Sequence, residues 1–150
     1  MAIIRITKQF SFEMAHALVG YDGLCKNIHG HSYHFDVTVK GIPNEDNFSP
    51  KKGMLMDFVD LKMIVYHEII NCFDHALVIS QNTDPDLISS LDKNYENILL
   101  MPYQPTSENL IADFAERLQK KLPPHVQLFS LRLRETDKSY AEWFAEDNQK

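Results

Sequence analysis

A chain of 150 residues, 44% of them hydrophobic, can fold as one domain over residues 1–150 and bury a core without cross-links. Its formal net charge of -6 argues against a nucleic-acid-binding protein, which normally carries a basic face. Cys25 and Cys72 are too few and too far apart for a disulfide framework. The first residues contain no apolar segment long enough for a signal peptide or a membrane span. We therefore expect a cytoplasmic enzyme or binding protein without nucleic-acid or membrane partners.

The first predicted strand covers residues 4–16. Its even-numbered positions are mostly apolar, and side chains two apart in a strand point to the same face of a sheet. The apolar face consists of Ile4, Ile6, Phe10, Phe12, Met14 and His16, interrupted by Lys8. The next residues, 17–27, contain two glycines and an aspartate and are predicted to form a loop. This strand therefore ends on a histidine, His16, that is in phase with its apolar face.

A second strand is predicted over residues 29–39, where apolar and polar residues alternate again. His29 and His31 fall on its apolar face, so they could meet His16 if the two strands pair. A buried imidazole needs a hydrogen bond or a metal, because an unpartnered polar group is costly to bury. Two histidines two apart on a strand can bind one zinc ion. From the residues alone, an ordinary turn or a hydrogen-bonded pair in the core is the alternative.

Two helices are predicted in the middle of the chain. The first fits residues 57–73, with Asp57 as N-cap and an apolar stripe of Phe58, Leu61, Val65 and Ile69. The second begins at Pro105–Glu108 and ends before the prolines at 123 and 124. Between them, residues 80–104 lack a clean pattern and are interpreted as an inserted segment. Within it, residues 89–101 could form a short helix and a strand-like turn.

The last third returns to strands, over residues 126–136 and 140–146. In the first of these strands, Phe129, Leu131, Leu133 and Glu135 share a face, which is unusual for a carboxylate. The order of elements is strand, strand, helix, helix, strand, strand. This order predicts an α+β fold, in which a four-stranded antiparallel sheet carries both helices on one face. Because such a sheet leaves a face and two edges uncovered, we also expect self-association.

Six short motifs occur in a characteristic order along the chain. Together they resemble the 6-pyruvoyl-tetrahydropterin synthase family over nearly the whole chain, except for residues 80–104, which are longer than in its compact members. The motifs are FxxAH ending at His16, C-x3-HGH from Cys25 to His31, DF at Asp57–Phe58, DH at Asp74–His75, PTSEN from Pro105 to Asn109, and RET from Arg134 to Thr136.

The resemblance implies a tunnelling fold, in which trimers form a barrel and two trimers stack into a hexamer with active sites between subunits. It implies Zn²⁺ bound by His16, His29 and His31, with a fourth position open for substrate. The implied substrate is 7,8-dihydroneopterin triphosphate. The three-residue gap between Cys25 and His29 resembles the bacterial branch of the family, which forms 6-carboxytetrahydropterin, acetaldehyde and triphosphate in the queuosine pathway. A biopterin-type synthase with a 6-pyruvoyl product and a non-catalytic zinc- or pterin-binding module are the alternatives.

The resemblance also implies roles for three residues in proton transfer. Cys25 would be the base that abstracts a proton, and the alternative is a fourth, structural zinc ligand. Asp74 and His75 would complete the proton relay. Because adjacent residues do not face each other in a regular helix or strand, contact between these two requires a turn. A helix-end aspartate followed by a solvated histidine is the alternative reading, and in a hexamer the pair could serve a neighbouring subunit.

Substrate binding is implied for three further residues. Glu135 would accept two hydrogen bonds from the pterin ring, and its alternative is a carboxylate that turns to solvent at the strand end. Thr106 and Ser107 could hydrogen-bond the ring edge but are equally good helix caps. For the triphosphate, charge and loop position make three lysines candidates without support from a motif, namely Lys26, Lys51 and Lys52.

Overall fold

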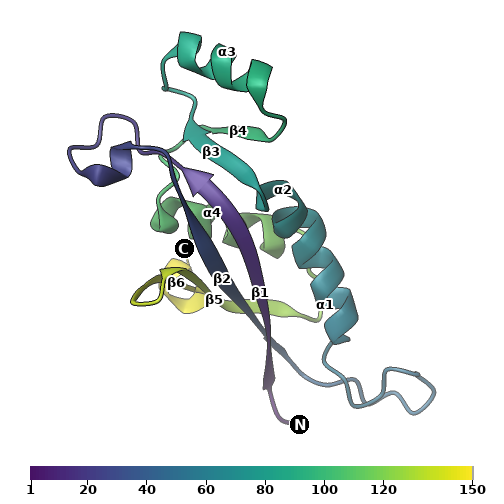
Figure 1. Cartoon of the computed structure of the whole chain (residues 1–150). Helices are drawn as coiled ribbons and strands as arrows, with labels where there is room; N and C mark the ends of the chain where they lie inside the picture. The colour runs from purple at the N-terminus through teal and green to yellow at the C-terminus, as the bar shows by residue number, and fades with distance from the viewer. Residues whose placement is uncertain (150) are drawn as a thin grey trace.

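The computed structural model describes residues 1–149, which form a twisted sheet with helices packed on it (Figure 1). The strands follow the order β4-β3-β1-β2-β5-β6 across the sheet. β1 pairs with β3, and β3 with β4, in parallel, whereas all other neighbours are antiparallel. The strands are β1 (Ile4–His16), β2 (His29–Gly41), β3 (Ala76–Ser80), β4 (Ile98–Met101), β5 (Gln127–Thr136) and β6 (Ser139–Phe144).

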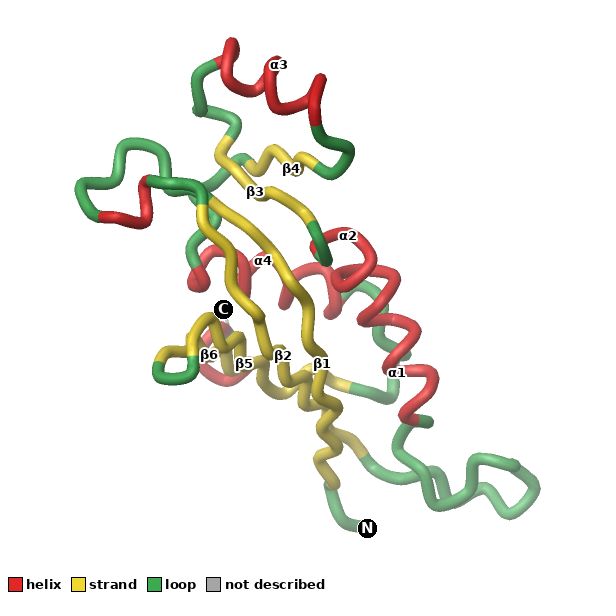
Figure 2. Tube along the Cα trace, viewed as in Figure 1, coloured by secondary structure: helices red, strands yellow, loops and turns green. Residues whose placement is uncertain are grey.

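The prediction of a four-stranded antiparallel sheet is therefore wrong, although the α+β class is confirmed. β1, β2, β5 and β6 form the expected antiparallel part, and β3 and β4 extend it on the far side of β1 (Figure 2). β3 is a short apolar run in which four of five residues are buried. Strands of this kind lack the alternation that reveals a half-exposed strand, which is why the sequence did not reveal it.

Both predicted helices are present and pack on one face of the sheet. The first comprises α1 (Phe58–Val65), a π-helical turn (Tyr66–Ile70) and α2 (Asn71–Phe73), and the Asp57 side chain caps its start by accepting from the Val59 amide. The second is α4 (Ser107–Gln119), where Thr106 caps by accepting from the Asn109 amide. In the described chain no helix is both long and apolar enough to cross a membrane.

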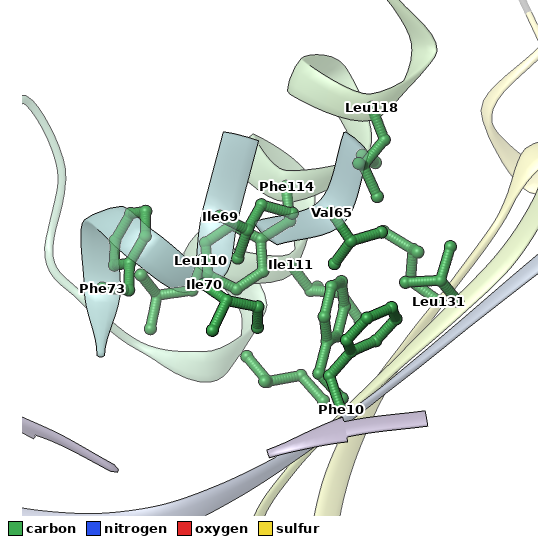
Figure 3. Close-up of a cluster of buried hydrophobic side chains, with 14 of the residues drawn as sticks. Phe10, Val65, Ile69, Ile70, Phe73, Leu110, Ile111, Phe114, Leu118 and Leu131 are labelled. Carbon is green, nitrogen blue, oxygen red and sulfur yellow. The ribbon is translucent and has the colours of Figure 1, made fainter. Parts of the chain in front are cut away.

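The core lies between these helices and the even-numbered residues of β1 (Figure 3). Phe114 of α4 is fully buried at its centre, and its ring makes edge contacts with the rings of Phe12, Phe35 and Phe73. Aromatic pairs in this geometry add to the free energy gained by burial. His16 lies at one end of the same β1 face and is 2% exposed. The core therefore fixes the strand ends that carry the histidines.

The inserted segment forms α3 (Pro85–Asn94) and β4, which agrees with the short helix and strand-like turn expected within it. Asp84 caps α3 by accepting from the Asp86 amide, and proline occupies the first helical position. No residue of α3 is buried. The segment is therefore attached chiefly by the pairing of β4 with β3, at the edge of the sheet.

One predicted facing in β5 is wrong. A β-bulge shifts the pairing of β2 with β5 between Thr38 and Val39, so that Leu128 is buried and Phe129 is not. Phe129 instead lies beneath the Arg5 guanidinium, 3.8 Å from it. The predicted facing of Leu131 and Leu133 toward the core is confirmed.

Candidate metal centre and flanking site residues

Three histidines meet at the end of the β1–β2 pair, as the alternation predicts. The antiparallel register places His16 opposite His29, and Met14 opposite His31. One ring nitrogen from each histidine lies within 4.8 Å of the others. Their rings are tilted or edge-on, with centroids 4.5 to 5.2 Å apart, rather than stacked. This arrangement could hold a metal ion.

Main-chain carbonyls orient two of the rings. Nδ1 of His16 is 2.7 Å from the Pro105 carbonyl oxygen, and Nδ1 of His29 is 2.7 Å from the Asn27 carbonyl oxygen. A carbonyl can only accept, so each Nδ1 carries a hydrogen and each neutral ring presents a lone pair at Nε2. These two Nε2 atoms are 3.0 Å apart. Two ligands bound to one zinc ion have nitrogens roughly 3.3 Å apart, so this donor set fits a metal.

Burial favours the neutral rings that a metal requires. It lowers the pKa of His16, and the opposing effects of the Pro105 carbonyl and the Glu135 carboxylate do not outweigh it. Burial likewise lowers the pKa of His31, against a smaller opposing effect of Glu135. Neutral imidazole is the form that binds metals.

Glu135 lies beside the histidines, as its phase in β5 predicts. Its Oε1 atom is 3.3 Å from Nε2 of both His16 and His31. The register of β5 with β6 shifts between Arg134 and Thr136, so Glu135 has no partner in that ladder. An irregularity of this kind re-aims a side chain. The carboxylate is 27% exposed, so one side of it remains open to a ligand.

Tyr33 is a site residue that the sequence reading treated only as part of an apolar face. Its ring is fully buried, edge-on to His16 and His31, and stacked on Phe12. Burial raises the pKa of the Tyr33 phenol, and the Glu135 carboxylate raises it further. Its hydroxyl has no hydrogen-bond partner among the described residues. The position of Tyr33 two residues after His31 was the signal that could have identified it.

Cys25 lies outside the histidine cluster. It occupies the 3₁₀ turn Leu24–Lys26, is exposed, and anchors the loop through its carbonyl, which accepts from the Leu18 amide. Among the described residues, the groups close enough to share a metal are the three histidines without Cys25.

Asp74 and His75 are in direct contact, and the backbone makes the turn that this contact requires. His75 has a φ of +60°, and its Nδ1 is 2.9 Å from Oδ2 of Asp74. The Glu13 amide donates to Oδ1 of Asp74, and the Glu13 carbonyl accepts from the His75 amide. Partial burial acts to raise the pKa of Asp74, but the Glu13 amide and His75 together hold it below its ordinary value. The pair is therefore a carboxylate and an imidazole fixed against each other.

Neither residue of this pair belongs to the group of histidines that could share a metal ion. His75 is 77% exposed and lines an open cavity of about 970 Å³, whose lining also includes Glu13, Ser32 and His31. Glu13 and Ser32 pair across β1 and β2 and alternate with Met14 and His31, so their side chains lie on the other face of the sheet. Residues of the inserted segment, including Tyr95 and Asn97, also line this cavity.

The remaining predicted residues are placed as follows. Thr106 is used as a helix cap, whereas the buried Ser107 hydroxyl has no hydrogen-bond partner in the described chain. Lys26 lies beside Cys25. Lys51 and Lys52 follow the Gly41 end of β2, opposite the His29 end, and twelve residues of strand span roughly 40 Å. These two lysines therefore cannot reach the histidines of their own chain.

The fold is that of an α+β domain, and its three clustered histidines could hold a metal ion. Residues 5–146 match the family model described as 6-pyruvoyl tetrahydropterin synthase, and the chain belongs to this family. It is 35% identical over 143 residues to the 6-carboxy-5,6,7,8-tetrahydropterin synthase of Haemophilus influenzae, covering 94% of this chain and 99% of the relative. It is 33% identical over 140 residues to the protein of that name from Synechocystis, covering 93% and 92%.

Solved structures share the fold over nearly the full length. An uncharacterized protein of Wolinella succinogenes superposes with a TM-score of 0.80 at 21% identity, covering 97% of this chain and 99% of that one. The 6-pyruvoyl tetrahydropterin synthase of Caenorhabditis elegans superposes with a TM-score of 0.68 at 25% identity, covering 97% of both chains. The family that the motifs indicated is therefore confirmed.

Proposed function

We propose that this chain is a zinc-dependent 6-carboxy-5,6,7,8-tetrahydropterin synthase, a lyase of queuosine and 7-deazapurine biosynthesis. It would convert 7,8-dihydroneopterin triphosphate to 6-carboxytetrahydropterin, acetaldehyde and triphosphate. The observation that carries the proposal is the histidine cluster, in which two lone pairs converge and Glu135 stands beside them. The names of the relatives from Haemophilus influenzae and Synechocystis support the choice of product.

Zinc suits this centre because His16, His29 and His31 can supply three nitrogen ligands and leave a position for substrate. A zinc ion held there would supply Lewis acidity that makes the hydroxyls of the substrate side chain more acidic. Tyr33 and the core behind it close the inner side of the cluster. Substrate would therefore approach from the side of Glu135, the more exposed side.

The proposed roles of the other residues follow from their placement. Glu135 would accept hydrogen bonds from the pterin ring, which brings the side chain of the substrate over the histidines. Cys25, on an exposed turn next to β2, would abstract a proton from that side chain. His75, oriented by Asp74, would give and take protons at a carbon of the substrate.

The exposure of His75 supports shared active sites. His75 is 77% exposed and lies outside the group of histidines that could share a metal ion, so a complete site would combine the cluster of one chain with His75 of another. We therefore include in the proposal a homohexamer formed as a dimer of trimers. A monomer found by light scattering at micromolar concentration would contradict this assembly.

A 6-pyruvoyl-tetrahydropterin synthase is the second candidate, and the description of the family model favours it. Both candidates use the same substrate, so analysis of the products separates them. The zinc-loaded protein is incubated with 7,8-dihydroneopterin triphosphate, and the products are identified by mass spectrometry. We expect 6-carboxytetrahydropterin and acetaldehyde, both abolished by a chelator. A 6-pyruvoyl product would identify the second candidate, and no turnover by a folded, zinc-loaded protein would indicate a non-catalytic binding module.

A further inference from the structure

The turn that carries Asp74 and His75 is held by groups from three separate parts of the fold. The Asp74 amide donates to the Ile70 carbonyl of the preceding helix, 2.8 Å away. Main-chain groups of Glu13 in β1 bind both Asp74 and His75. The third contact comes from the inserted segment, where the Asn97 side-chain amide donates to the Asp74 carbonyl at 3.3 Å.

This turn needs such support because its backbone is strained. His75 adopts a φ of +60°, in the left-handed region that residues other than glycine rarely occupy. A residue persists there when its surroundings over-determine its conformation. The groups from the helix and from β1 belong to the main chain and cannot be removed by substitution. Asn97 is the one side chain from the inserted segment that bonds to the turn in the described structure.

Asn97 is well placed to stabilise this turn. It lies directly before β4, and its carbonyl accepts from the amide of Leu77 in β3, 2.9 Å away. Parallel pairing then continues from Leu77 with Ile98 to Ser80 with Met101. Asn97 therefore binds on both sides of His75, to the carbonyl of residue 74 and to the amide of residue 77.

We infer that Asn97 is a positioning residue for the Asp74–His75 pair, and that the inserted segment serves to hold this pair through Asn97. This inference rests on the proposed function, because it gives the segment a role in that reaction. Asn97 would not touch the substrate's reacting atoms through this contact. It would fix the direction of the His75 imidazole in the cavity, which residues of the same segment also line.

The test compares Asn97→Ala and Asn97→Asp with Asn82→Ala. Asn97→Asp keeps the size of the side chain but replaces the donating amide by a carboxylate, which guards against a folding defect of the alanine variant. Asn82 is an exposed asparagine of the same segment and lies outside the cavity lining, so Asn82→Ala is the matched control. We expect both Asn97 variants to lose about tenfold or more in kcat, with KM within about twofold of wild type. Asn82→Ala should match wild type.

A second measurement does not depend on activity. The amide of His75 donates to the Glu13 carbonyl, and we expect its hydrogen exchange to become faster in both Asn97 variants, with the helix α4 unchanged. Unchanged kcat and unchanged exchange at His75 would overturn the inference, as would an equal loss in Asn82→Ala. If the wild type shows no turnover, the proposed function fails, and the exchange measurement still decides whether Asn97 holds the turn.

Discussion

The histidine cluster and His75 are imidazole sites that the fold holds in opposite ways. His16 is 2% exposed, and main-chain carbonyls fix the rings of His16 and His29. His75 is 77% exposed and stands on a left-handed turn, oriented by a carboxylate. A metal ligand benefits from a rigid, dry environment that keeps it neutral. A proton-transfer group must instead reach its partner and exchange protons. The difference therefore supports the proposal that the cluster binds a metal and that His75 transfers protons.

The largest effect on zinc content and turnover is expected when one histidine of the cluster is removed. Replacing His29 by alanine removes one of three nitrogen ligands, so we expect zinc content to fall from one ion per chain to near zero. We expect turnover to fall by about a thousandfold or more, equivalent to about 4 kcal/mol of transition-state stabilisation. Metal analysis and product formation measure the two effects. The control is His34→Ala, an exposed position on the other face of β2. Full zinc content in His29→Ala would show that the cluster is not the metal site.

Replacing His75 is expected to lower turnover by a smaller factor and to leave zinc content unchanged. We choose His75→Asn, because asparagine tolerates the left-handed backbone that this position requires. Loss of a general acid or base lowers kcat by about 10²–10⁴-fold, while zinc content should stay at the wild-type level. The matched control is His67→Asn, another exposed histidine, on the π-helical turn. If His75→Asn lost zinc, the separation between the two regions would be wrong.

Mixing these variants tests whether the two regions act across a subunit boundary. His29→Ala and His75→Asn chains are unfolded together, refolded in equal amounts and assayed. If a site combines the cluster of one chain with His75 of another, random assembly restores up to about a quarter of the wild-type sites. Each variant refolded alone is the control. No recovery in mixed, correctly assembled oligomers would mean that each chain supplies its own His75.

The sequence predicted the positions of site residues wherever one face of a strand is buried. A period of two residues placed His16, His29 and His31 together, and it also turned Glu135 toward them. These predictions needed only local alternation and the pairing of two consecutive strands. The contact between Asp74 and His75 was likewise foreseeable as a turn.

The features of the fold and site that the sequence did not reveal depend on contacts between distant segments. β3 and β4 are short and pair in parallel, so neither alternation nor a hairpin turn reveals them. The position of the Asp74–His75 turn against β1 follows from its bonds to Glu13, which lies 62 residues before His75. Lys51, a candidate for binding triphosphate, lies at the end of β2 that is far from the histidines of its own chain, and it pairs with Asp57.

The smallest expected effect concerns pH and the carboxylate of the Asp74–His75 pair. The folded protein holds the pKa of Asp74 below its ordinary value of 3.8, so folding favours the ionised form. Its contribution to stability is therefore fully present above about pH 3.8 and is lost as the pH falls through the lower folded-state pKa. We expect Asp74→Asn to unfold at a lower urea concentration than wild type near neutral pH, and this difference in urea midpoint to narrow below pH 3.8. The side-chain amide oxygen of the Asp74→Asn variant could still accept from the Glu13 amide, so the difference in midpoint reports on the charge. A difference that stayed constant down to pH 2 would show that the charge on Asp74 does not stabilise the turn.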